Sequence, residues 1–132
     1  MANAVYPKWK ENVIAGNYSL SAAVVKVLLV DTLSYTYNAA HENLSDISAG
    51  ARIFTSTALT GKTFTNGTFD AADKTLTAVT GNQSEALVLY VSGTSSTSAE
   101  LIAYIDSGTN LPVTPNGGDI IIQWNGSGIF SL

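Results

Sequence analysis

The chain contains the run Val24-Val-Lys-Val-Leu-Leu-Val30, in which every residue but one is apolar and most are β-branched. A strand with one face in water alternates apolar and polar residues, whereas a strand covered on both faces is apolar throughout. We therefore expect residues 24–30 to form a strand in the middle of the core. Asp31 and Thr32 mark its end.

Further segments of the same character follow along the chain. Turn signals such as Asn66-Gly67 separate them about every ten residues, and no helices alternate with them. This pattern predicts an all-β fold of eight or nine strands, an antiparallel β-sandwich that is jelly-roll-like, and it argues against a parallel α/β fold. The expected strands after the first lie within residues 52–60, 62–65, 75–79, 85–91, 100–105, 119–124 and 129–132. The expected buried core includes Val27, Leu29, Val88, Tyr104 and Ile121.

The first 20 residues have a different pattern. Pro7 suits the first turn of a helix, and Trp9 begins a helically spaced apolar set that Gly16 would end. We expect residues 1–20 to form an N-terminal arm or short helix, and residues 21–132 to form a single β-sandwich domain.

The composition combines 45% hydrophobic residues with only 12% charged ones, about half of the typical charged share of ~25%. Such a surface is a poor way to keep a lone monomer soluble, so we expect part of it to be buried in a homo-oligomer, with a trimer favoured and a dimer as the alternative. The net charge is −4, with six basic against ten acidic residues. Because few cations are present to neutralise phosphates, a nucleic-acid partner is not expected.

No cysteine is present, so disulfides and thiolate metal sites are excluded and the chain suits a reducing cytoplasm. The N-terminus lacks the basic-then-apolar order of a signal peptide. The longest apolar run, residues 22–30, contains Lys26 and is shorter than the ~20 residues that span a bilayer. We expect no membrane association and no secretion by the usual route.

Motifs that carry chemistry are weak in this sequence. Thr60-Gly-Lys-Thr63 is similar to the end of a phosphate-binding loop, but that loop needs a glycine where this chain has Ser56, and a helix after it. The only histidine, His41, has Asp46 a helical turn away, which suits a proton-transfer pair or a hard-cation site. We expect instead that both side chains hydrogen-bond an irregular connector and cap its turn. The sequence thus predicts no enzyme activity, no catalytic or metal-binding residue and no cofactor.

One short segment combines aromatic and basic residues. It consists of Tyr6, Pro7, Lys8, Trp9 and Lys10. Such a segment can anchor on an acidic partner surface through apolar burial and charge, which makes it the candidate interface. The alternative, which we consider equally, is a helix packed on its own domain.

Several motifs together resemble a widespread group of small virion proteins of tailed phages, over nearly the whole chain. They are Val25-Lys-Val-Leu-Leu-Val-Asp31, Tyr35-Thr-Tyr37, His41-Glu-Asn-Leu-Ser-Asp-Ile47, Ala58-Leu-Thr-Gly-Lys-Thr63, Gly67-Thr-Phe-Asp-Ala-Ala-Asp73, Ala78-Val-Thr-Gly81, Leu101-Ile-Ala-Tyr-Ile-Asp106 and Leu111-Pro-Val-Thr-Pro-Asn-Gly-Gly-Asp119. The resemblance implies a protein made in the host bacterial cytoplasm that decorates or cements the outer capsid surface of the virion. It also implies the major capsid protein as partner and a dimeric or trimeric state, and it transfers no functional residues.

Two other functions are weighed against this one. A tail- or fibre-associated binding module would recognise a host surface glycan through the loops at residues 92–98 and 112–118. An enzyme of jelly-roll type would need a clustered metal site, which one histidine and scattered acidic residues do not supply.

Overall fold

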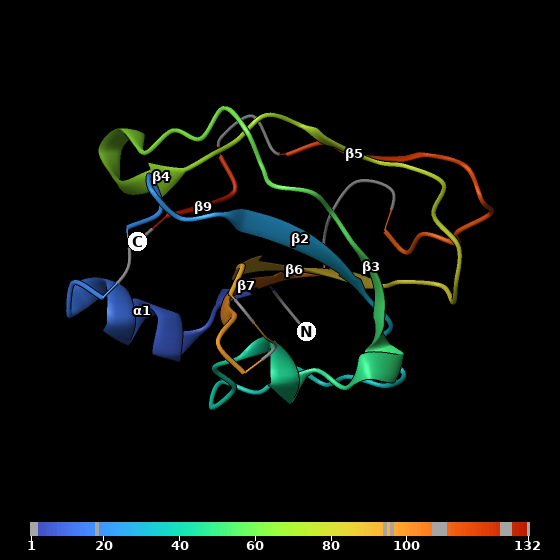
Figure 1. Cartoon of the computed structure of the whole chain (residues 1–132), viewed down its shortest axis with the longest axis horizontal. Coiled ribbons are helices and arrows are strands. Elements are labelled where there is room, and N and C mark those ends of the chain that lie inside the picture. Colours follow the sequence, from blue (N-terminus) through green and yellow to red (C-terminus); the bar gives the residue numbers. More distant parts are fainter. Residues whose placement is uncertain are drawn as a thin grey trace.

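The structure is a computed structural model that describes residues 3–17, 19–93, 95, 97–106, 111–124 and 128–131. It is built mostly of antiparallel strands with one short α-helix, which confirms the predicted all-β class (Figure 1). A five-stranded sheet has the order β1 (Ala4–Val5), β7 (Glu100–Ile105), β6 (Ala86–Val91), β2 (Val25–Val30) and β3 (Arg52–Thr55). Two separate antiparallel pairs are β4 (Thr68–Phe69) with β9 (Phe130–Ser131) and β5 (Lys74–Leu76) with β8 (Ile120–Ile122).

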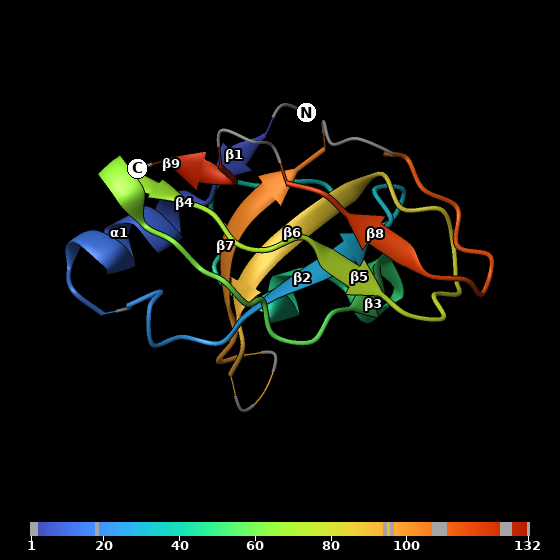
Figure 2. The same cartoon turned by 90° about the horizontal axis from the view of Figure 1, so that it is seen from above.

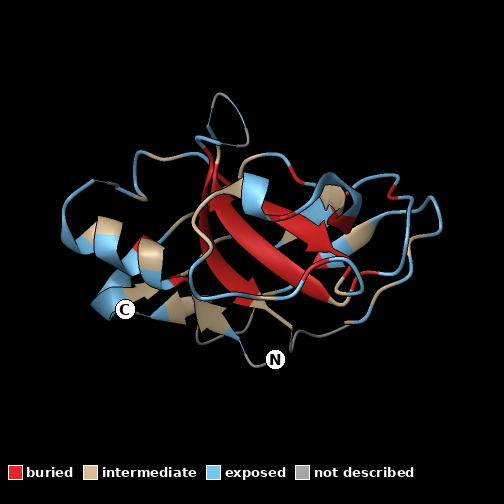
Figure 3. Ribbon diagram, turned by 90° about the horizontal axis from the view of Figure 1, so that it is seen from below, coloured by how far each residue is buried: buried red, intermediate tan, exposed pale blue. Residues whose placement is uncertain are grey.

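The central strands β2 and β6 are covered on both faces, as the sequence predicts. They pair in register from Val25↔Val91 to Val30↔Ala86, and only Lys26 among their residues is not fully buried. Figure 2 shows β5 and β8 lying over one face of this sheet. Figure 3 shows the opposite face, where the connector formed by residues 31–51 crosses the buried strands.

The predicted strand at residues 52–60 is shorter in the structure, because β3 ends at Thr55. The chain then continues along β2 with irregular bonds. The Ser56 hydroxyl accepts a hydrogen bond from the Val27 amide at 2.9 Å, and the Leu59 amide donates to the carbonyl of Val25 at 2.8 Å. A side-chain oxygen at this point takes the place of a ladder carbonyl, which ends the regular strand.

The predicted core is correct at four of its five residues, and wrong at Ile121. Val27, Leu29, Val88 and Tyr104 are buried, whereas Ile121 is 56% exposed. Successive side chains of a strand point to opposite faces, and the pair β5–β8 covers the sheet with one face only. Its inward position is the neighbouring residue 122, which is buried, so Ile121 points to solvent.

The N-terminal segment forms α1 (Pro7–Ile14), and this confirms the predicted short helix. Pro7 occupies the start of the helix, and Gly16, with φ of 79°, follows its end in the left-handed conformation that favours glycine. However, the first ten residues do not form an arm that stands apart from the core. Strand β1 pairs with β7 and Trp9 is fully buried, so this segment is part of the core.

The predicted turn at Asn66-Gly67 is present, and both residues have positive φ, 54° and 77°. It is closed by an isolated bridge between Thr63 and Asp70 rather than by a hairpin of two full strands, because β4 pairs with β9 instead. The predicted tip at residues 92–98, the turn stretch at 110–118 and the last strand each reach outside the described residues, at positions 94, 96, 110 and 132.

Candidate binding site

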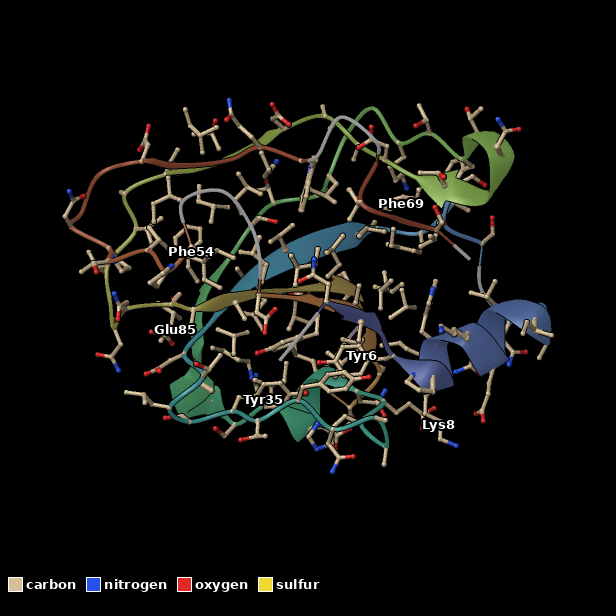
Figure 4. The ribbon with its side chains drawn as sticks, turned by 180° about the vertical axis from the view of Figure 1, so that it is seen from behind. Tyr6, Lys8, Tyr35, Phe54, Phe69 and Glu85 are labelled. Carbon is tan, nitrogen blue, oxygen red and sulfur yellow. The ribbon has the colours of Figure 1, made fainter. Side chains whose placement is uncertain are left out.

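Four tyrosines and the histidine gather on the face of the central sheet that the connector covers. Tyr6 precedes α1, Tyr104 lies on β7, and Tyr35, Tyr37 and His41 belong to the connector. The ring centroids of Tyr6 and Tyr37 are 5.0 Å apart, those of Tyr37 and Tyr104 5.4 Å, and those of Tyr35 and His41 5.4 Å. Figure 4 shows Tyr6 and Tyr35 close together beneath the sheet. We call these five residues the tyrosine cluster.

A chain of hydrogen bonds runs through the tyrosine cluster. The hydroxyls of Tyr6 and Tyr35 are 2.8 Å apart, and the Tyr35 hydroxyl is 2.8 Å from Nδ1 of His41. Burial raises the pKa of Tyr6 far above its ordinary value and raises the pKa of Tyr35 to about 12, although the bond to Tyr6 opposes the second shift. Both hydroxyls therefore keep their protons at neutral pH. They are poor acid–base groups there, and they fix the connector against the sheet.

The connector is also held by its own side chains, and the predicted capping role is confirmed for Asp46, whereas the hydrogen bond of His41 is to the hydroxyl of Tyr35. The Asp46 carboxylate accepts hydrogen bonds from the amides of Glu42 and Asn43 at 2.8 and 3.0 Å, across the 3₁₀ turn that begins at Leu44. These two bonds lower the pKa of Asp46, burial opposes them, and His41 adds to the lowering. The carboxylate thus stabilises an irregular backbone, and the histidine holds the Tyr35 side chain.

A hollow of about 370 Å³ opens beside the tyrosine cluster. Its wall includes Tyr35, Tyr37 and Tyr104, together with the carboxylates of Glu85 and Asp106. Thr32, Thr36, Leu111 and Pro112 also line it. We call it the tyrosine hollow.

Glu85 has a fixed position at the edge of the tyrosine hollow. It lies just before β6, and its Oε1 accepts hydrogen bonds from both the amide and the hydroxyl of Thr32, at 3.0 and 3.1 Å. Figure 4 places it on the connector side, away from Phe69. Burial raises the pKa of Tyr104, and Asp106 and then Glu85 raise it further. Both carboxylates therefore act on the same hydroxyl, where they disfavour a negative charge.

The five residues of the candidate interface differ in how far they are exposed in the structure. Tyr6 and Trp9 are fully buried in the protein's own core, as the alternative interpretation predicts. Pro7 and Lys10 are exposed, and the half-buried Lys8 has its ammonium 3.2 Å from a carboxylate oxygen one helical turn away. Only the outer surface of α1 is thus accessible to a partner, and the two aromatic side chains are not.

The loop similar to a phosphate-binding motif has a structural use. The ammonium of Lys62 donates to the backbone carbonyls of Leu20 and Ala23, the first at 2.7 Å. Gly61 has a positive φ of 65°, and Thr63 forms the isolated bridge noted above. A single 3₁₀ turn, Thr65–Gly67, then follows in place of the α-helix that phosphate binding would require. The motif therefore fastens the 20–23 segment to the sheet.

No group of three or more His, Cys, Asp or Glu side chains is placed to hold a metal ion within the part of the chain that the structure describes. Over those same residues, no helix has both the length and the apolar character needed to cross a membrane.

The loops expected to recognise a glycan differ in their relation to the site. Residues 112–118 meet it through Pro112, and Val113 is held by paired backbone bonds to Ser84 at 2.8 and 2.9 Å. The described residues of the 92–98 loop do not line the hollow.

Sequence reasoning did not identify the tyrosine hollow. The signal that was present is the Tyr35-Thr-Tyr37 alternation inside an otherwise polar connector, since two aromatics in such a segment must pack against something. The sequence gives no indication that Tyr104 and Glu85 meet them, because Tyr104 lies on β7 and Glu85 just before β6, both far from the connector along the chain.

In sequence comparisons, no known protein family matches this chain, and no curated protein is significantly similar to it. The resemblance to phage virion proteins stays a prediction.

Proposed function

We propose that the protein is a structural protein of a phage virion that decorates or cements the outer capsid surface and stabilises the shell. It binds the major capsid protein as a homo-oligomer, with a trimer favoured over a dimer, and uses no cofactor. Each copy makes a modest contact, and because the symmetry of the shell repeats this contact, the contacts add through avidity. The motifs that resemble virion proteins and the all-β fold support this function.

The observation that carries the proposal is that half of the basic side chains are bonded within the protein itself. Three of the six basic residues, Arg52, Lys62 and Lys74, donate from their side chains to backbone carbonyls at 2.8, 2.7 and 3.0 Å. The surface is therefore even poorer in cationic groups than the composition indicates, and Leu33 and Ile14 are 92% and 86% exposed on it. Away from Lys8 and Lys10 on α1, contact with a neighbour then requires little desolvation of cationic charge, which suits a protein that is buried in an assembly.

The proposal includes the finer architecture. We take the pairs β4–β9 and β5–β8 as the second layer of a jelly-roll-like β-sandwich, facing the five-stranded sheet (Figure 2). The inner faces of the two layers share the apolar core, with Phe69 and Leu76 buried beneath the second layer. Jelly-roll and sandwich folds are common among proteins that build shells, and this architecture supports the function by analogy alone.

Virion localisation tests the function directly. Particles labelled with an antibody against this protein are viewed by electron microscopy, and we expect label over the whole capsid. Absence of the protein from purified virions contradicts the proposal, and so does label at one vertex only. A native mass of three chains is expected for the free protein, and a stable monomer contradicts the oligomeric part.

The outer surface of α1 is the proposed contact, carried by Pro7, Lys8 and Lys10, with Ile14 alongside. Charge reversal in the double variant Lys8→Glu/Lys10→Glu should weaken decoration of shells that lack the protein, because an acidic partner surface would then repel it. Lys26→Glu in β2 reverses one charge away from α1, which is half the change in net charge of the double variant, and it should bind as the unaltered protein does. Equal binding by all three proteins places the contact elsewhere.

The second candidate is a tail- or fibre-associated module that recognises a host surface glycan. The tyrosine hollow favours it, because aromatic rings and carboxylates also line many sugar sites, and Pro112 belongs to a loop expected to take part. Label at one vertex of the virion would support this candidate.

A further inference from the structure

The tyrosine hollow brings Glu85 and Asp106 together with Tyr35, Tyr37 and Tyr104, and no lysine, arginine or histidine is among the described residues that line it. We propose that this hollow is a docking pocket for the guanidinium group of an arginine side chain on the partner protein that this chain decorates. The identity of the partner rests on the proposed function, whereas the chemistry of the pocket does not.

Charge complementarity is the first argument. The pKa of Tyr104 is raised by burial and then by Asp106 and Glu85, so a negative charge is disfavoured at this hydroxyl. The same potential favours a cation, and it is screened less in a half-buried hollow than on an open surface. A neutral ligand would cover the Glu85 carboxylate without compensating its charge, which costs free energy.

Hydrogen-bonding capacity is the second argument. Oε1 of Glu85 accepts both bonds from Thr32, and Oε2 has no hydrogen bond among the described residues. These two bonds hold the carboxylate in place, so Oε2 is an oriented acceptor for a donor that enters the hollow. A carboxylate accepts only, so the ligand must donate.

The aromatic wall selects guanidinium over ammonium. Tyr37 is half-buried, and its ring lies 5.4 Å from that of Tyr104, so two adjacent rings border the space. A guanidinium group is planar, less strongly hydrated than an ammonium, and stacks on aromatic rings while it donates to carboxylates. The volume of about 370 Å³ is sufficient for one such side chain.

The position of the hollow agrees with the proposed contact. The connector and α1 lie on the same side of the central sheet in Figure 1, and Tyr6 joins the tyrosine cluster to the start of α1. In Figure 4, Glu85 lies toward one end of this side of the molecule and Lys8 of α1 toward the other, so a partner that reaches both must span the connector.

The test is a titration of the full chain, followed by amide chemical shifts in NMR. The probes are N-acetyl-arginine amide, N-acetyl-lysine amide, N-acetyl-citrulline amide, which is the uncharged analogue of arginine, and methyl glucoside. We expect the arginine probe to shift the amides of Thr32, Tyr37 and Glu85 at lower concentration than any other probe. Glu85→Gln keeps an acceptor for Thr32 but removes the charge, and it should weaken arginine binding at least about fivefold.

The matched control is Glu42→Gln, which removes the same charge from a connector residue that does not line the hollow. It should leave arginine binding unchanged. The proposal is overturned if citrulline binds as well as arginine, if lysine or methyl glucoside binds more tightly, or if Glu85→Gln has no effect. It is also overturned if no amide of the hollow shifts at about 100 mM probe, because a dissociation constant of about 10 mM would already give near saturation there.

Failure of the proposed function is visible separately. Virions that lack the protein remove the proposed partner but leave the arginine titration unaffected. If the Glu85→Gln variant and the unaltered protein decorate capsids with equal affinity, the docking role of the hollow is overturned. The decoration function is then left intact.

Discussion

The two faces of the central sheet are covered in different ways. On one face the strand pairs β4–β9 and β5–β8 cover it, and Phe69 packs against Phe64 and Phe130 with ring centroids 5.8 and 5.3 Å apart. On the other face an irregular connector covers it, and the contacts are tyrosine hydroxyls, one histidine and the capped 3₁₀ turn. Figure 4 shows the two sides, with Phe69 on one and Tyr35 on the other.

This difference explains where the site is. Paired strands satisfy the hydrogen-bonding groups of their own backbone. The side chains with which they cover the sheet can therefore be apolar and leave no opening. An irregular segment must find partners for its backbone among polar side chains, and it packs less regularly against the sheet. The tyrosine hollow therefore opens on the connector side, where polar groups are already present.

Removal of residues 1–10 should have the largest effect, because it takes β1, Tyr6 and Trp9 from the connector side. Loss of a buried Trp alone costs about 3–5 kcal/mol, out of a total stability of roughly 5–15 kcal/mol for a domain. We expect no cooperative unfolding transition in the truncated chain, measured by circular dichroism. The control is Lys8→Ala/Lys10→Ala, which should melt as the unaltered protein does. A truncated chain with an unchanged melting temperature would show that residues 1–10 are dispensable.

The sequence predicted the regular part of the molecule and not the irregular part. Strands β2, β6 and β7 and helix α1 were predictable because continuous apolar runs and helical spacing are local signals. Ile121 was misplaced because three consecutive isoleucines give no phase for the alternation of side chains. The hollow was not predictable, since the contact of Tyr37 with Tyr104 depends on the path of the connector and leaves no periodic pattern.

The second largest effect is expected for Leu29→Ala at the centre of the sheet. Leu29 is fully buried in β2, and truncation should lower the free energy of unfolding by about 2–5 kcal/mol, measured by denaturant titration. Leu33→Ala, at a residue that is 92% exposed, should change it by less than about 0.5 kcal/mol. Similar losses in both variants would contradict the described burial.

Tyr6→Phe should measure how much the hydroxyl hydrogen bonds on the connector side contribute to stability. It removes one hydroxyl of the chain, but Tyr35 keeps its bond to His41, so we expect a loss of about 0.5–1.5 kcal/mol in the free energy of unfolding. Tyr37→Phe is the matched control, because no hydrogen bond of the Tyr37 hydroxyl is found among the described residues. An equal loss in both variants would mean that the hydroxyl chain adds nothing specific.

Asp46→Asn should show how much the Asp46 cap of the 3₁₀ turn stabilises the connector, because this contribution depends on pH. The pKa of Asp46 is lowered in the folded chain, so the carboxylate stabilises the fold above its ordinary value of 3.8, and this contribution is lost as pH falls through the lower folded value. The side chain is exposed, so we expect the variant to be less stable at pH 7 by under about 1 kcal/mol. The difference should shrink below about pH 4. A difference that grows in acid would contradict the assigned cause.

The smallest effect is expected on the side covered by strand pairs, for Ile121→Thr in β8. Threonine keeps the β-branched shape that suits a strand, and Ile121 is 56% exposed, so the free energy of unfolding should change by less than about 0.5 kcal/mol. The same substitution one residue on, Ile122→Thr, places a hydroxyl where the side chain is 7% exposed and should cost at least about 1.5 kcal/mol. Chemical denaturation of the two variants measures the contrast directly. If Ile121→Thr proved the more costly, β8 would present its other face to the sheet, and the register of β5 with β8 would have to shift by one residue.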